Sequence, residues 1–259
     1  MQISGDSYKK TTGLGDNHFP NTVIFIPCCD SKHINNRYSD TPVGITQTEL
    51  PNTWQLLNNG RMAMRNCIVN DSPKVPAINL YDGLFYRSIS PTWDSLLNEI
   101  NKGWLRIFVV SAGYGIIDIR EPIKNYNAEM RKSTQLTCKC GATLWKQNHL
   151  ENIICDLLIK LQPERVFGYF AGGPQWDTAE AKYRFFFEKG VRLAKHSGVK
   201  TKCSGCFFRS KWNDSRQILR ALGKAFVDHY KANFSCSFAI QLQSNGHIYY
   251  EVTISFKPL

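Results

Sequence analysis

The sequence predicts an α/β fold built on a mainly parallel central sheet with helices on both faces. Three apolar runs rich in Ile, Val and Phe, at 22–27, 105–110 and 165–171, are typical of strands buried on both faces. Between them lie stretches whose apolar residues recur at helical spacing, as in 90–103 and 148–162. Strands that alternate with helices favour parallel pairing through helical crossovers.

Local signals set the expected bounds of the first elements. Ser90 is a favourable N-cap, Pro91 suits the first helical position, and Gly103 closes that helix. Pro163 ends the second helix. Upstream of both helices, residues 75–81 (VPAINLY) are expected to form another short strand of the sheet.

The C-terminal part of the chain is expected to add two helices and then antiparallel strands. The helices are predicted over 177–195 and 215–230. Strands 236–242 and 248–256 would then form a C-terminal hairpin, because Asn245-Gly246 is a strong signal for a tight turn.

The length and the absence of a linker predict one folded unit. Residues 1–20 are expected to be a polar leader and residues 21–259 a single α/β catalytic domain. No apolar run approaches the ~20 residues that a membrane span needs, and no signal-peptide core is visible at the N-terminus. A soluble, cytoplasmic protein without a membrane partner is expected. In that compartment, the nine cysteines favour free thiols or metal ligands over disulfides.

The charge predicts a polyanionic partner. The formal net charge is +11, which favours nucleic acid first and an anionic membrane surface second. Between Lys182 and Lys224, twelve Lys or Arg residues face only two acids, with aromatic residues interleaved. Basic side chains neutralise phosphates and aromatic faces stack on bases, so double-stranded DNA is the expected partner. The expected DNA-binding residues are Lys200, Lys202, Arg209, Lys211 and Arg216.

Polar residues follow the predicted strands where functional loops of α/β folds gather. The strand at 105–110 runs directly into Ser111-Ala112-Gly113-Tyr114-Gly115, and the strand at 22–27 runs into 28–33 (CCDSKH). Because ligands bind beyond the carboxyl ends of parallel strands, these loops and residues 172–176 after the strand at 165–171 are expected to share one pocket. The expected substrate-binding residues are Cys28, Tyr81, Asp82, Ser111, Gly113, Tyr114, Tyr126, Asn127, Gly172 and Gly173.

Two close cysteine pairs raise the alternative of a structural metal. Cys138 and Cys140 form one pair, and Cys203 and Cys206 form another with zinc-knuckle spacing. Four thiolates would make a closed zinc site, whereas free thiols are the other interpretation. No cofactor is expected for the chemistry itself: the chain contains no Walker loop, complete dinucleotide fingerprint, Gly-x-Ser-x-Gly elbow or His-Glu-x-x-His helix.

Three motifs resemble an uncharacterised bacterial protein family. They are residues 28–32 (CCDSK), residues 76–81 (PAINLY), and residues 111–117 (SAGYGII) with Ile123 and Tyr126 behind them. The resemblance implies a distant branch of the uracil-DNA glycosylase fold. The chain also resembles anti-phage DNA glycosylases that remove glucosylated hydroxymethylcytosine, which implies phage DNA with modified bases as the partner. It departs from uracil glycosylases in having no Gly-Gln-Asp-Pro-Tyr and no His-Pro-Ser motif.

The expected reaction is excision of a flipped-out base, which leaves an abasic site. Cleavage of an N-glycosidic bond builds positive charge on the sugar, and a carboxylate stabilises that charge or orients water. Asp30 and Asp118 are the two candidate carboxylates, and Lys32 is a further catalytic candidate. The thiol of Cys28 or of Cys29 is an alternative nucleophile. Two other functions stay open: a nucleotide N-glycoside hydrolase or deoxyribosyltransferase, and a non-catalytic module that binds modified nucleic acid without an obligate protein partner.

Overall fold

A computed structural model describes most of the chain. The described residues are 22–133, 137–171, 182–208, 215–234, 243–244 and 247–252. The expected leader, Gly172, Gly173, Arg209 and Lys211 lie outside them, as does the whole first strand of the expected C-terminal hairpin, 236–242.

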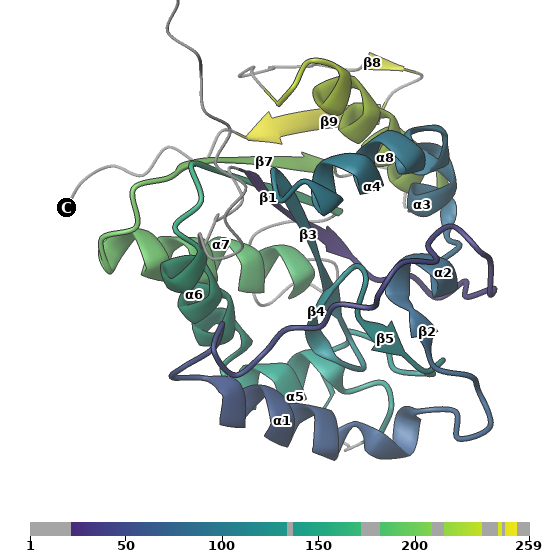
Figure 1. Cartoon of the computed structure of the whole chain (residues 1–259), viewed down its shortest axis with the longest axis vertical. Coiled ribbons are helices and arrows are strands. Elements are labelled where there is room, and N and C mark those ends of the chain that lie inside the picture. Colours follow the sequence, from purple (N-terminus) through teal and green to yellow (C-terminus); the bar gives the residue numbers. More distant parts are fainter. Residues whose placement is uncertain are drawn as a thin grey trace, which may run out of the picture.

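The described strands form one large sheet with the order β4-β3-β1-β6-β7-β9-β8, and β2 pairs with β5 apart from it (Figure 1). β3, β1, β6 and β7 run parallel, while β4 is antiparallel to β3 and β9 is antiparallel to β7. The predicted mainly parallel sheet is confirmed. The strands are β1 (Thr22–Pro27), β2 (Val75–Pro76), β3 (Leu105–Ser111), β4 (Gly115–Asp118), β5 (Pro122–Ile123), β6 (Arg165–Ala171), β7 (Lys202–Phe208), β8 (Gln243–Ser244) and β9 (His247–Val252).

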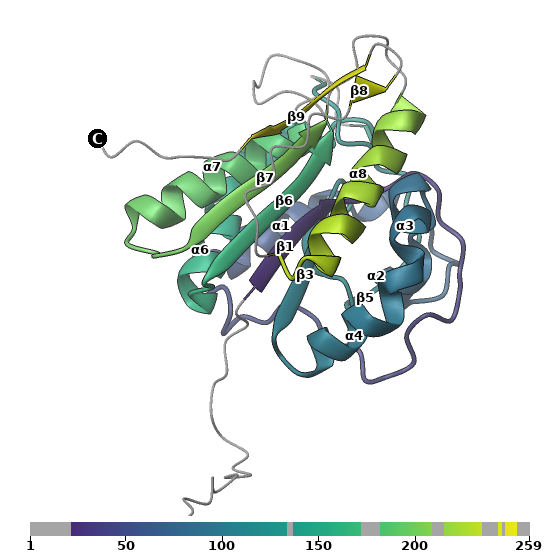
Figure 2. The ribbon, with the colours of Figure 1, turned by 90° about the horizontal axis from the view of Figure 1, so that it is seen from above.

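Helices flank this sheet on both sides. Figure 2 shows α6 and α7 on one side and α3, α4 and α8 on the other. α1 and α5 join the layer of α6 and α7, since both contact α6. The helices are α1 (Trp54–Ala63), α2 (Ala77–Leu80), α3 (Leu84–Ile89), α4 (Trp93–Asn101), α5 (Gly141–Gln147), α6 (Leu150–Leu161), α7 (Lys182–His196) and α8 (Ser215–Lys231), with 3-10 turns η1 (Arg65–Cys67) and η2 (Ser90–Thr92).

The core explains why the apolar runs become central strands. Every residue of β1 is buried, because β3 and β6 cover its edges and helices cover its faces. The ring of Phe25 lies 5.6 Å from Phe108 on β3 and 5.5 Å from Phe187 on α7. Aromatic packing of this kind joins the sheet to its helical layer. Truncating such a ring to Ala lowers the free energy of unfolding by about 3–5 kcal/mol.

Two local expectations are wrong. Only Val75 and Pro76 of the segment 75–81 are a strand, and residues 77–80 form the short helix α2. Ser90 does not cap a helix: its hydroxyl donates to the carbonyl of Arg87 (2.8 Å), because α3 already precedes it. Gly103 does close α4, with φ of +78°. Within the described ranges, no helix is both long and apolar enough to cross a membrane.

Candidate functional site

The candidate site lies where the order of the parallel strands reverses. From β1 the chain continues to β3 on one side and later returns to β6 on the other side of β1. In open α/β sheets, the crevice beyond the carboxyl ends of such strands is where ligands bind. Residues 28–33 leave β1 at this point. The amide of Cys28 still donates to the carbonyl of Val110 (3.0 Å), so the loop begins in register with β3.

A short antiparallel bridge holds the loop after β1 in place. Lys32 pairs with Tyr81, the amide of Asp82 donates to the carbonyl of Ser31 (3.0 Å), and the amide of His33 donates to Leu80 (3.0 Å). These bonds use backbone groups on both segments. The side chains of the loop are therefore presented by a fixed backbone rather than by a free turn.

A buried network of hydroxyl groups and a thiol lies under the loop. The hydroxyls of Tyr81 and Tyr126 share a hydrogen bond of 2.8 Å, and Ser111 Oγ donates to the Tyr126 hydroxyl (3.0 Å). On the other side, Cys28 Sγ and the Tyr183 hydroxyl are 3.1 Å apart. Burial first, and the nearby Cys28 second, raise the pKa values of all three tyrosines well above the usual range. The phenols therefore stay neutral and act as hydrogen-bond partners.

Lys32 and Asp30 leave the same loop in different settings. The Lys32 ammonium lies over the face of the Tyr126 ring, 4.2 Å from its centre, and 3.4 Å from the Asp30 carbonyl. Asp30 itself is exposed, and its carboxylate makes no hydrogen bond or ion pair with the residues that the structure describes. One loop at the end of the central strand thus carries both a cation held over an aromatic ring and an accessible carboxylate.

Asp82 takes part in several ion pairs. Its carboxylate contacts Arg37 (3.1 Å), Arg87 (2.8 Å) and His33 (3.7 Å). Hydrogen bonding from Arg87 is the largest influence that lowers the pKa of Asp82, and Arg37 adds to it against a burial penalty. Arg37 also donates to the carbonyls of Ile78 and Tyr81. Asp82 therefore fixes the segment that carries Tyr81, and its carboxylate is already neutralised.

Asp118 does not join Asp30. It lies on β4 opposite Phe108, not at the end of β3, and β3 separates β4 from β1. Its side chain is only 1% exposed and pairs with Arg106 and Arg120, both at 3.0 Å. Burial raises the pKa of Asp118, but the two guanidinium groups outweigh burial, and the net pKa is lowered. The two candidate carboxylates therefore do not leave neighbouring strands, because β4 turns back along β3.

Other predicted residues serve the packing around Tyr126. A Cβ on Gly113 would lie 2.7 Å from the Tyr126 ring, so only glycine fits there without a shift. The Tyr114 hydroxyl donates to the carbonyl of Lys124 (3.2 Å), and its amide donates to Ser111 Oγ (3.2 Å). The backbone of Asn127 donates to the carbonyl of Cys67 (2.9 Å), while its side chain is exposed.

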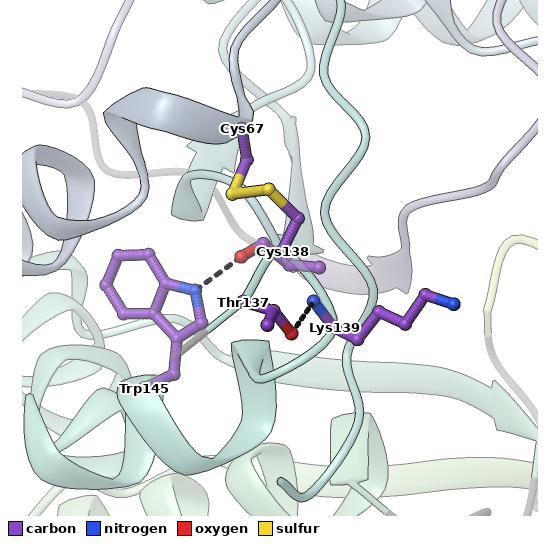
Figure 3. Close-up of a disulfide and its surroundings, with 6 residues drawn as sticks. Cys67, Thr137, Cys138, Lys139 and Trp145 are labelled. Atoms are coloured by element: carbon purple, nitrogen blue, oxygen red, sulfur yellow. Dashed lines mark hydrogen bonds between the residues drawn. A yellow bond between two sulfur atoms is a disulfide. The ribbon is translucent and has the colours of Figure 1, made fainter. Parts of the chain in front are cut away.

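The cysteines follow a different pattern from the one expected. Cys67 and Cys138 form a disulfide across 71 residues, shown in Figure 3 beside Trp145. Cys138 is therefore neither a free thiol nor a zinc ligand. Cys203 lies on β7, where burial raises its pKa to about 12, and Cys140 is buried near the disulfide. The described residues contain no group of three or more metal-ligating side chains. The Cys206 side chain lies outside the described atoms.

The three expected DNA-binding residues that the structure describes lie at opposite ends of the strands of the sheet. Lys200 and Lys202 are exposed at the start of β7. They therefore lie at the amino ends of the parallel strands, whereas the candidate site lies at the carboxyl ends. The two ends of β7 are about 20 Å apart, because a strand rises ~3.3 Å per residue. Arg216 is exposed in the first turn of α8, which follows the carboxyl end of β7. Lys200 and Lys202 do not line the crevice beside Asp30.

Sequence patterns did not reveal two members of the site. Tyr183 appeared only as one of several aromatic residues in a basic stretch, and Arg37 lay in an irregular polar segment. Both enter the site through contacts that span more than 40 residues. Only the packing of α7 against the sheet and of the segment after β1 against α2 brings them in.

Comparisons with known proteins agree with a distant relationship only. No protein-family model matches the chain. Among curated proteins, it is 25% identical over 138 residues to a UPF0246 protein of Streptococcus pneumoniae strain Hungary19A-6. It is also 25% identical over 142 residues to a UPF0246 protein of strain ATCC 700669. Each match covers 51% of this chain and 54% of the relative. The chain thus spans about half the length of the curated relatives it matches.

Proposed function

We propose that this protein is a DNA glycosylase that excises a modified, flipped-out base, with Asp30 as the catalytic carboxylate. The observation that carries the proposal is the placement of Asp30 and Lys32 on one rigid loop at the end of the central parallel strand. The net charge of +11 supports a nucleic-acid substrate. Burial of Asp118 in an arginine clasp leaves Asp30 as the accessible candidate of the pair.

The chemistry assigns a separate task to each side chain. The bond between C1′ of the deoxyribose and the base nitrogen breaks, and its electron pair leaves with the base. The Asp30 carboxylate opposes the positive charge that develops on the sugar and accepts a proton from the water whose oxygen bonds to C1′. The Lys32 ammonium neutralises the charge of the departing base. A proton from solvent completes the base.

The sharpest test measures released base. Duplex DNA with unmodified cytosine and with glucosylated hydroxymethylcytosine is incubated with the protein, and the products are analysed by mass. Wild type should release only the modified base, and Asp30→Asn should lower the single-turnover rate by roughly two to four orders of magnitude while DNA affinity stays largely intact. Asp71→Asn, an exposed aspartate distant in sequence from the loop, is the matched control and should match wild type.

The same assay separates the competing functions. Release of base from free nucleosides or nucleotides, but from no DNA, would replace the proposal by a small-substrate N-glycoside hydrolase. Tight binding of modified DNA without any released base would identify a binding module. Equal rates for wild type and Asp30→Asn on modified DNA would remove Asp30 from the mechanism.

A further inference from the structure

The two cysteines of the Cys67–Cys138 disulfide both bind the segment that carries Tyr126. The Cys67 carbonyl accepts a hydrogen bond from the amide of Asn127 (2.9 Å), and the Cys138 carbonyl accepts one from the amide of Glu129 (2.7 Å). The two cysteines belong to parts of the chain that are 71 residues apart. Their covalent bond therefore keeps together the two parts that hold this segment in place.

Tyr126 connects the segment to the candidate site. Ile68, next to Cys67, pairs with Tyr126 in an isolated antiparallel bridge. The Tyr126 side chain is buried, and its hydroxyl accepts a hydrogen bond from Ser111 (3.0 Å). The Lys32 ammonium lies over the same ring, 4.2 Å from its centre. A displacement of the segment would therefore move the ring that positions Lys32.

The disulfide lies outside the central sheet, and one of its ends is partly accessible. Cys67 ends the 3-10 turn η1, Cys138 lies in the loop before α5, and neither belongs to a strand (Figure 3). Cys138 is half-buried, and its neighbours Thr137 and Lys139 are exposed. An external thiolate breaks a disulfide only if it reaches one of the two sulfur atoms. Cys138 is the end at which this attack does not require the sheet to open.

The fold does not depend on a framework of disulfides. Small secreted domains that need such a framework pair most of their cysteines. Here the other described cysteines are free thiols: Cys28, Cys29, Cys140, Cys155 and Cys203. Burial of the apolar strands and helices stabilises the sheet without this bond. Loss of the bond should therefore loosen one segment and leave the sheet folded.

We propose that the Cys67–Cys138 disulfide is a redox switch of the candidate site, and that reduction by a dithiol loosens the Tyr126 segment and releases Lys32. One thiolate of the dithiol bonds to Cys138 Sγ, the S–S bond breaks, and Cys67 leaves with the electron pair and takes a proton. The second thiol of the dithiol loses its proton and displaces Cys138, which becomes a thiol in turn. The dithiol supplies two electrons and ends as a disulfide. Slower base release after reduction rests on the proposed function, whereas the release of Lys32 does not.

The test compares oxidised wild type, reduced wild type and a Cys67→Ser/Cys138→Ser double variant. Dithiothreitol is the dithiol, oxidised glutathione reverses the reaction, and mass analysis counts the thiols of each sample. The double variant is the matched control: it keeps the other cysteines, so any effect of dithiothreitol on those thiols appears in it as well. Reduction acts on the wild-type chain, so the comparison of its two states does not require the double variant to fold.

Reduction should change the segment and its contact with Lys32. In a short deuterium pulse, the amides of Asn127 and Glu129 should exchange roughly tenfold faster after reduction, while those of β1 stay protected. Labelling of Lys32 by an amine-specific reagent, measured relative to the exposed Lys160 of α6, should rise by up to about fivefold, the factor expected for loss of a contact with an aromatic face. Reoxidation should restore both values. The double variant should resemble reduced wild type with and without dithiothreitol.

Three results would overturn the switch. The first is a thiol count that dithiothreitol does not change. The second is equal labelling of Lys32 in the oxidised and reduced protein, which would limit the bond to a local role in stability. The third is exchange of the β1 amides as fast as that of Asn127, which would make the bond a support of the whole fold. None of these measurements uses released base, so failure of the glycosylase activity is separate from failure of the switch.

Discussion

The ammonium of Lys32 lies 4.2 Å from the centre of the Tyr126 ring. The ring is itself held by a hydrogen bond that its hydroxyl accepts from Ser111 and by one that it shares with the Tyr81 hydroxyl. A segment about 95 residues downstream thus determines where the cation of the β1 loop stands. Contacts between a cation and an aromatic face contribute about 0.5–1 kcal/mol when partly exposed, enough to favour one position of a flexible lysine.

Replacing the Tyr126 ring should release Lys32. Tyr126→Phe keeps the aromatic face and loses the hydroxyl, whereas Tyr126→Leu loses both. Labelling of Lys32 by an amine-specific reagent, measured by mass spectrometry relative to the exposed Lys160 of α6, should rise in Tyr126→Leu and stay near wild type in Tyr126→Phe. Base release should fall more in Tyr126→Leu than in Tyr126→Phe. Equal labelling in both variants would show that the ring does not position Lys32.

Asp118 should contribute to stability and not to chemistry. Asp118→Asn leaves Arg106 and Arg120 with one carboxylate fewer in a buried setting, which should lower the free energy of unfolding by about 3–5 kcal/mol. Urea unfolding measures this loss. Base release per folded molecule should equal wild type. A selective loss of turnover with normal stability would return Asp118 to the reaction.

The same carboxylate sets a pH dependence of stability. The pKa of Asp118 is lower in the folded state than the ~3.9 of an unfolded aspartate. Its stabilisation is therefore fully present above pH ~4 and is lost as the pH falls through the folded pKa. The free energy of unfolding of Asp118→Asn should fall less steeply below pH ~4 than that of wild type. Parallel urea titrations of the two proteins across this range provide the measurement.

The Cys67–Cys138 disulfide should stabilise the segment that carries Tyr126. Closing a loop across 71 residues restricts the unfolded chain, which typically contributes about 2–4 kcal/mol. A reductant should therefore lower the melting temperature of wild type and leave a Cys67→Ser/Cys138→Ser double variant unchanged. Mass analysis under non-reducing conditions counts the thiols directly. Equal melting of wild type with and without reductant would contradict the bond's contribution.

Charge reversal at the amino ends of the parallel strands should leave binding at the candidate site unchanged. Lys200→Glu with Lys202→Glu changes charges about 20 Å from the crevice, well beyond the screening length of about 8 Å at physiological salt. Affinity for a short single strand should stay near wild type. A large loss of affinity would place the strand along β7 and move the DNA surface away from Asp30.

Much of the fold was predictable because the strong signals are local. Continuous apolar runs such as 22–27 indicate a strand that is buried on both faces, and helical spacing over 148–162 indicates a helix with one packed face. The prediction of a strand over 75–81 is wrong because residues 77–81 are buried on every side, so period and composition do not separate a strand from the helix α2. Ser90 failed as a cap because α3 runs directly into it.

The sequence by itself determined the alternation of strands and helices, the parallel sheet, the basic charge, and the loop from Cys28 to His33 as the first place for chemistry. Only the tertiary structure decided which of these residues meet. It turned β4 back along β3, which carried Asp118 into an arginine clasp, and it joined Cys138 to Cys67. It also packed α7 against the sheet, which brought Tyr183 to Cys28. These outcomes depend on contacts between residues far apart in the chain. Local periodicity does not predict such contacts, because it depends only on neighbouring residues.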